Sequence, residues 1–287
     1  MKIIKLLSCF LVFSAFLFFA CKSAPPPPEK TPSASIMFWD VEADTPDRIS
    51  VNFSLKIDNP FPFTAVAAMG SWQAEINGRN PGKHAGLNLV YPDGDFPIMA
   101  GLSVSVPLKL NMDIAALAAD GYAPFDDYKI NLIIDLVFSS PDVKLRVSGL
   151  AEFPGVQAPV FKIISIAILK AELVNTRFRV GLEISNPNPY PVKLSAFAYE
   201  LYGNGRLWAD GSEKNIIDVS GKSSVKGNLY LIMNFINMKR DLLDQIIRLE
   251  DVNYRFAGTA QVSVGVEYLP DFLTGFDLSG YSEVLEN

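Results

Sequence analysis

An alternating segment that ends in Asn-Pro-x-Pro-aromatic occurs twice in this chain of 287 residues. The first copy covers 49–63 and the second covers 176–190, a spacing of 127 residues. In both copies, large apolar residues alternate with polar or small ones, and a period of two places them on one face of a strand. These apolar residues are Val51, Phe53, Leu55 and Ile57 in the first copy, and Phe178, Val180, Leu182 and Ile184 in the second. The chain is therefore expected to build one strand-and-turn unit twice.

Further matches continue the repeat. Asn77-Gly78 returns as Asn204-Gly205, a preferred two-residue hairpin turn because both positions tolerate positive φ. A short helix is expected in each copy, over 114–119 behind an Asp113 cap and over about 238–249 behind an Asn237 cap. Strands are expected at 104–110, 129–138 and 143–151, and again at 225–233, 253–267 and 276–284.

Short strands, turn signals and one helix per copy predict an all-β chain of two tandem antiparallel β-sandwich domains, at 36–153 and 160–287. Pro154, Gly155 and Pro159 mark a short linker between them. The apolar run 160–173 also fits a short helix, but its β-branched isoleucines favour the first strand of the second domain.

The first twenty residues have the layout of an export signal. Lys2 and Lys5 precede an apolar run that ends at Ala20, too short for a first choice as a bilayer span. Phe18-Phe19-Ala20-Cys21 resembles the cleavage box of bacterial lipoproteins, in which a cysteine after a small residue becomes acylated, although Phe18 stands where that pattern prefers leucine. We expect a signal peptide over 1–20 and a membrane anchor at Cys21 in the bacterial cell envelope. The sequence is compatible with the periplasmic face and with the outer surface.

Residues 21–35 are expected to form a tether. Their prolines, at positions 25–28 and 32, favour an extended, solvated polyproline II chain. Cys9 would leave with the signal, so Cys21 would remain as a lone cysteine without a disulfide.

Charge and composition exclude several function classes. A net charge of -6 removes the electrostatic basis for binding nucleic acid, and a single histidine, His84, excludes sites that need two imidazoles. The acidic pairs at 93–95 and 126–127 lack calcium-loop spacing, Asp135 is expected to face outward from a strand, and Ser220-Gly221-Lys222-Ser223 lacks the first glycine of a phosphate loop. No catalytic residue, metal or cofactor is expected.

The repeated motif resembles that of the late-embryogenesis-abundant type 2 family, also called the WHy (water stress and hypersensitive response) domain. The motif residues are Asn59, Pro60, Pro62 and Phe63, and Asn186, Pro187, Pro189 and Tyr190. The resemblance implies a fibronectin-like sandwich without catalytic residues and links the chain to desiccation and stress tolerance. We expect a structural role for the motif: prolines end strand pairing, asparagine bonds the turn, and the aromatic ring packs on the sandwich edge.

These observations favour a lipid-anchored envelope protein that binds or protects envelope components, with a lipid or protein partner, and not an enzyme. One alternative is a carrier of lipid or another hydrophobic ligand, with a helix over an apolar groove, suggested by the many large apolar residues, among them 20 phenylalanines. A surface adhesin or assembly scaffold is the other alternative.

Overall fold

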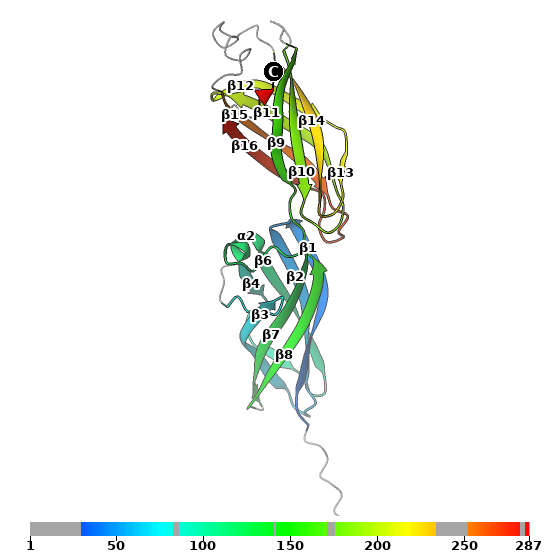
Figure 1. Ribbon diagram of the computed structural model, residues 1–287. Coiled ribbons are helices and arrows are strands. Elements are labelled where there is room, and N and C mark those ends of the chain that lie inside the picture. The colour runs from blue at the N-terminus through cyan, green and yellow to red at the C-terminus, as the bar shows by residue number, and fades with distance from the viewer. Residues whose placement is uncertain are drawn as a thin grey trace, which may run out of the picture.

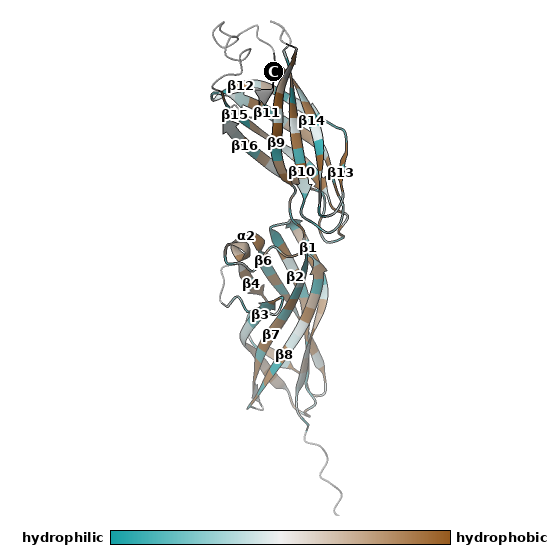
Figure 2. Ribbon diagram, viewed as in Figure 1, coloured by the Kyte–Doolittle hydropathy of each residue, from teal (hydrophilic) through white to brown (hydrophobic). Residues whose placement is uncertain are grey.

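The computed structural model describes residues 30–82, 86–140, 142–170, 176–233, 252–281 and 285–286. The described chain forms two β-structured units that lie end to end (Figure 1), the first unit over 30–154 and the second unit from residue 160. Apolar and polar residues alternate along their strands (Figure 2), which gives each unit its own buried core. The prediction of an all-β fold built from antiparallel sheets is confirmed.

The first unit packs two four-stranded sheets against each other, in the orders β1-β2-β6-β4 and β5-β3-β7-β8. Its core includes Phe53, Tyr128 and Phe138. Gly149 of β8 lies against Ile36 of β1, so the two sheets approach closely along this side. The strands are β1 (Ser33–Thr45), β2 (Arg48–Asp58), β3 (Ala65–Ile76), β4 (Leu87–Val90), β5 (Phe96–Ile98), β6 (Ser103–Asp113), β7 (Asp127–Ser140) and β8 (Asp142–Pro154).

The second unit forms one continuous sheet in the order β16-β15-β11-β12-β14-β10-β9-β17, with β13 paired to β11. The sheet is continuous because β12 pairs with both β11 and β14. Phe161 of β9 and Phe276 of β16 touch across the core, with ring centroids 4.9 Å apart. The strands are β9 (Val160–Lys170), β10 (Thr176–Asn186), β11 (Val192–Gly203), β12 (Arg206–Glu213), β13 (Ile217–Val219), β14 (Ser223–Met233), β15 (Asn253–Ser263), β16 (Phe272–Tyr281) and β17 (Leu285–Glu286).

The strand orders of the two units coincide when β1 is set against β9. The order β9-β10-β14-β12 then repeats β1-β2-β6-β4, and β13-β11-β15-β16 repeats β5-β3-β7-β8. The units differ after the Asn-Gly turn. In the second unit the turn continues into a full β11–β12 hairpin, whereas in the first only an isolated bridge joins Ile76 and Arg79.

Both Asn-Gly turns have the positive φ angles that the sequence predicts, 49° and 75° at Asn77-Gly78 and 48° and 75° at Asn204-Gly205. The side chain of each asparagine also binds the neighbouring sheet. Asn77 Oδ1 accepts a hydrogen bond from the backbone N–H of Lys129 at 2.7 Å, and Asn204 Oδ1 accepts one from Asn253 at 3.0 Å.

Helix α2 (Ile114–Ala119) has the predicted bounds. Asp113 caps it by accepting a hydrogen bond from the Ala116 N–H at 3.0 Å, and Gly121 follows its end with a φ of 76°. Ile114 and Leu117 are buried in the core of the first unit. The helix expected at 238–249 lies outside the described residues.

Three boundaries refine the sequence analysis. Ser33–Ser35, assigned to the tether, belong to β1 because they pair with Asp58–Lys56. The strand expected at 253–267 ends at Ser263, because Gly265 has a φ of 65° and Leu269 N–H closes a turn on the Val266 carbonyl. The run from Val160 is a strand, as its β-branched residues predict, and it ends at Lys170 among the described residues.

Candidate functional site: the Asn-Pro signature and the joint between the units

The signature asparagines, Asn59 and Asn186, are buried and make the same set of hydrogen bonds in both units. Asn59 Nδ2 donates to the carbonyls of Phe63, Ile98 and Met99 at 2.8–3.1 Å, and its Oδ1 accepts from the Phe61 N–H at 3.0 Å. Asn186 Nδ2 donates to the carbonyls of Tyr190, Val219 and Ser220 at 2.7–3.1 Å, and its Oδ1 accepts from the Asn188 N–H at 2.9 Å.

These bonds explain why an asparagine stands before proline at this place. Each asparagine stands at the end of a long strand, where Pro60 or Pro187 removes the next backbone donor. The primary amide supplies donors in its place and ties the turn to the end of the short strand β5 or β13. A buried carbonyl without a donor is costly, so the amide stabilises a turn that cannot satisfy itself.

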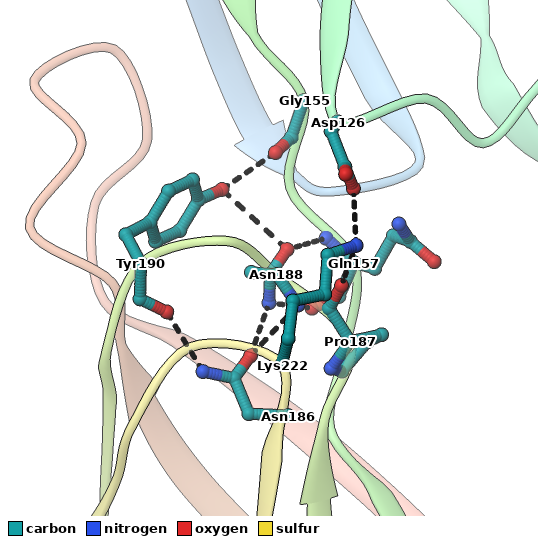
Figure 3. A network of polar contacts seen from close by, with 8 residues as sticks. All are labelled: Asp126, Gly155, Gln157, Asn186, Pro187, Asn188, Tyr190 and Lys222. Atoms are coloured by element: carbon teal, nitrogen blue, oxygen red, sulfur yellow. Dashed lines mark hydrogen bonds and ion pairs between the residues drawn. The ribbon is translucent and has the colours of Figure 1, made fainter.

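In the second unit the signature also binds the linker that arrives from the first unit (Figure 3). Asn188 is fully buried. Its Nδ2 donates to the Gln157 carbonyl at 2.8 Å, and its Oδ1 accepts from the Gln157 N–H at 2.7 Å. This reciprocal pair resembles the pairing of two strands, and it fixes the linker against the turn.

Two tyrosine hydroxyls extend this joint. Tyr190 donates to the Gly155 carbonyl at 2.6 Å, and Tyr268 donates to the Pro154 carbonyl at 2.5 Å. Tyr268 also accepts at its backbone carbonyl from the Ala43 N–H of the first unit, at 3.0 Å. Burial raises the pKa of both phenols, and the carboxylates of Asp126 and Asp127 add to the raised pKa of Tyr190. Both hydroxyls therefore remain protonated donors at neutral pH.

Lys222 completes the joint from the turn before β14. It lies in the left-handed region with a φ of 50°, and its N–H donates to the Asn188 carbonyl at 2.8 Å. Its ammonium contacts the Asp126 carboxylate of the first unit and the Pro187 carbonyl, each at 2.6 Å (Figure 3). Both charged side chains are exposed, so this ion pair contributes less to stability than the buried bonds of Asn188.

The first signature lies at the opposite end of the first unit and differs in its side chains. Phe61 and Phe63 stack with ring centroids 5.1 Å apart, and Phe63 is 45% exposed. We expected the aromatic residue of each signature to pack on the sandwich edge. Tyr190 does pack against the core of its unit, whereas Phe63 points its ring onto Phe61 in a solvent-exposed turn.

Two surface depressions lie near the joint and on the first unit. A cleft of about 1340 Å³ runs between the units, lined by residues of both, including Asp44, Arg48 and Glu267. A groove of about 660 Å³ continues from it across the sheet of β1, β2, β6 and β4, between Trp39 and Tyr91. Lys109 and Glu42, which line both depressions, form an ion pair at 3.0 Å that holds the pKa of Glu42 below its ordinary value.

The other residues singled out in the sequence either lie outside the described residues or face solvent. Cys21 and His84 lie outside the described residues. Asp135 faces outward, where its carboxylate accepts from Ser71 Oγ at 2.7 Å. Among the residues that the structure describes, no three metal-ligating side chains gather in one place. In the same part of the chain, no helix is long and apolar enough to cross a bilayer.

Sequence reasoning missed most of the joint. In the sequence, Asp126 and Lys222 belong only to calcium-loop and phosphate-loop patterns that fail, and no pattern singles out Gln157 or Tyr268. These residues come from four separate segments that meet only through the arrangement of the two units. The shortness of the linker marked by Pro154, Gly155 and Pro159 is the sequence signal that the two units touch.

The geometry defines a class: all-β units in which a buried asparagine at the end of a long strand ties an Asn-Pro turn to the neighbouring sheet. Residues 181–267, which include the second signature, match the family model described as late embryogenesis abundant protein. This match supports the resemblance of the second unit to the late embryogenesis abundant type 2 family, which the sequence motif indicated.

Comparisons with other proteins give low similarity. No curated protein matches the chain by sequence. A protein from Archaeoglobus fulgidus of known structure is 20% identical over 44% of this chain and 97% of its own length, with a TM-score of 0.27. Red sea bream transglutaminase is 11% identical over 90% of this chain and 32% of its own, with a TM-score of 0.29. The secreted serine protease VesC from Vibrio cholerae is 9% identical over 64% of this chain and 43% of its own, with a TM-score of 0.22.

Proposed function

We propose that this chain is a non-catalytic, lipid-anchored protein of the bacterial cell envelope, in which two copies of a late-embryogenesis-abundant type 2 domain form one rod that binds or protects envelope components. The observation that carries the anchor is Cys21, placed directly after an export-like leader and before a proline-rich tether. The equal strand orders and the equal bonds of Asn59 and Asn186 support the two copies.

The geometry of the described chain agrees with an anchor at the end of the first unit that lies away from the second unit. Ser33, where β1 begins, pairs with Asp58 at the end of the first unit that lies away from the second (Figure 1). A tether joined there leaves the joint, the cleft and the second unit free of the membrane. At about 3.1 Å per residue, an extended tether of this kind reaches on the order of 40 Å.

Metabolic labelling with a fatty acid tests the anchor. The wild-type protein is expected to take up label and to sediment with membranes, and Cys21→Ala is expected to lose label and to release the protein into the soluble fraction. Cys9→Ala is the matched control, because that cysteine lies in the leader and its loss leaves labelling unchanged. Equal label on wild type and Cys21→Ala would contradict the anchor.

The protective role has its own test. A fragment that begins at Lys30 keeps the whole of β1, and it is expected to preserve the activity of a test enzyme through drying better than an inert protein at equal mass. Equal losses of activity with the two additives would remove stress protection from the proposal and leave the anchor intact.

A carrier of hydrophobic ligands is the second candidate, because the groove of about 660 Å³ is lined by Trp39, Phe53 and Pro107 among others. The groove crosses an outer sheet face, and α2, which the sequence suggested as its cover, instead buries Ile114 and Leu117 in the core. Native mass spectrometry is expected to find lipid on the purified protein and less on Trp39→Ala. An apo spectrum for wild type would exclude the carrier role.

A further inference from the structure

The outer end of the first unit carries a cluster of apolar side chains, which we name the apolar tip: Phe61, Phe63, Met99 and Leu102. Met99 is 68% exposed, Leu102 is 55% exposed, and Phe63 stacks on the half-buried Phe61. The backbone joins the four residues closely, since the Gly101 N–H donates to the Phe61 carbonyl and the Leu102 N–H to that of Met99, both at 3.1 Å. Clustered apolar exposure of this kind marks a surface that contacts a partner.

The equivalent positions in the second unit carry polar side chains on the same backbone. The strand registers that pair Asp58 with Ser103 and Ser185 with Ser224 fix the correspondence between the two turns. By that correspondence the apolar tip is replaced, in order, by Asn188, Tyr190, Ser220 and Ser223. The fold therefore does not require apolar residues at the tip.

The polar set of the second unit has a known neighbour, because Asn188 and Tyr190 bind the linker from the first unit. The neighbour of the apolar tip can be inferred from where the chain goes. Asp58 precedes the first signature and pairs with Ser33, so the 29 residues before Lys30 join the molecule at this same end. The apolar tip thus lies at the end of the first unit where the described chain begins.

Charged side chains lie at the same end of the first unit as the apolar tip. Lys56 and Asp58 pair at 3.1 Å, and hydrogen bonding from Ser103, together with Lys56, holds the pKa of Asp58 below its ordinary value. Asp142, the first residue of β8, lies at the same end. An apolar centre flanked by charged side chains suits contact with the boundary between lipid headgroups and acyl chains.

We propose that the apolar tip inserts into the surface of the bilayer to which the chain is anchored, so that the rod stands on the membrane through its first unit. The inference rests on the proposed anchor, and it adds a second contact of the molecule with lipid. The tether then sets the reach of the anchor, while Phe63, Met99 and Leu102 set the orientation of the rod.

Tryptophan quenching in vesicles tests this contact. The full chain, isolated from membranes, is reconstituted into phosphatidylcholine vesicles with brominated acyl chains, as wild type, Phe63→Trp or Leu207→Trp. Leu207, in β12 at the far end of the second unit, is 49% exposed and so matches Phe63. After subtraction of the wild-type signal, the tryptophan at 63 is expected to lose intensity and to shift to shorter wavelength, and the tryptophan at 207 to do neither. Equal behaviour at both positions would overturn the proposal.

A second variant separates a lost contact from a lost fold. Met99→Ser and Leu102→Ser together, introduced into Phe63→Trp, copy the residues of the second unit and are expected to restore full fluorescence with unchanged thermal unfolding. Persistent quenching in this variant would also count against the tip. The fatty-acid label is read on the same preparations. A preparation without label contradicts the acyl anchor alone. The quenching test of the tip remains valid in that case, because an uncleaved leader would still hold the full chain at the vesicle.

Discussion

At the scale of single residues, the side-chain amide of the asparagine makes the hydrogen bonds that fix each signature turn. Asn59 and Asn186 each bridge a turn and the end of a short strand, and no other uncharged side chain offers two donors and an acceptor in so short a span. Their conformational role follows from the sequence, because proline next to a strand end leaves backbone groups unsatisfied. The side chains that surround them decide what each turn contacts.

Replacing Asn186 with alanine is expected to lower the free energy of unfolding by roughly 2–4 kcal/mol, because each buried carbonyl left without its donor costs about 1–3 kcal/mol. Urea unfolding measures the change. Asn228→Ala, at an exposed position of β14, is the control and is expected to change stability by less than about 0.5 kcal/mol. Equal effects at the two positions would show that the amide does not hold the turn.

Buried tyrosines are expected to lower the stability of the fold at alkaline pH. Burial raises the pKa of Tyr128 to about 12 and also raises those of Tyr190 and Tyr268 above the ordinary value of 10.0. Above pH 10.0 the unfolded chain therefore binds fewer protons than the folded chain, and stability is expected to fall as pH rises. Thermal unfolding between pH 8 and pH 11 measures this. Tyr190→Phe with Tyr268→Phe is expected to flatten the decline, and an unaltered slope would contradict the assignment.

At the scale of elements, much of the fold could be predicted from local patterns. The period of two located β2 and β10, Asp113 located α2, and the Asn-Gly turns have the expected φ angles. The strands β1, β3, β11 and β12 were not predicted as separate elements. The short strands β4, β5 and β13 were also missed, because three or four residues carry too little pattern to separate them from loops. The end of β15 was also missed, since a backbone reversal at Gly265 leaves the apolar alternation intact.

The contact between β1 and β8 yields a prediction of its own. A Cβ at Gly149 would lie 2.4 Å from Ile36 Cγ2 and 2.7 Å from its Cβ, so Gly149→Ala is expected to destabilise the chain by about 1–3 kcal/mol. Differential scanning calorimetry measures it. At Gly275 of β16, a Cβ would meet nothing closer than 3.8 Å, and Gly275→Ala should change stability by less than about 0.5 kcal/mol. Comparable losses in the two variants would refute the close approach.

At the scale of the whole molecule, one backbone turn serves two surfaces. In the second unit it presents Asn188 and Tyr190 to the linker, and in the first it presents Phe61 and Phe63 to solvent. This difference could not be predicted from the sequence alone, because the exposure and the neighbours of the two turns depend on how the units are stacked. The polar joint is therefore expected to make the two units a single rigid rod.

The distance between the units tests that central claim most directly. Spin labels on cysteines at Lys144 of β8 and Lys226 of β14, both exposed, are introduced into the full chain with Cys9 and Cys21 replaced by alanine. Pulsed electron paramagnetic resonance is expected to give one narrow distribution of the distance between the two labels. Asn188→Phe, which copies Phe61 of the first turn, is expected to broaden this distribution. Circular dichroism of the variant is expected to retain the β spectrum. A broad distribution in the parent chain, or one that Asn188→Phe leaves unchanged, would contradict a joint held by the second signature.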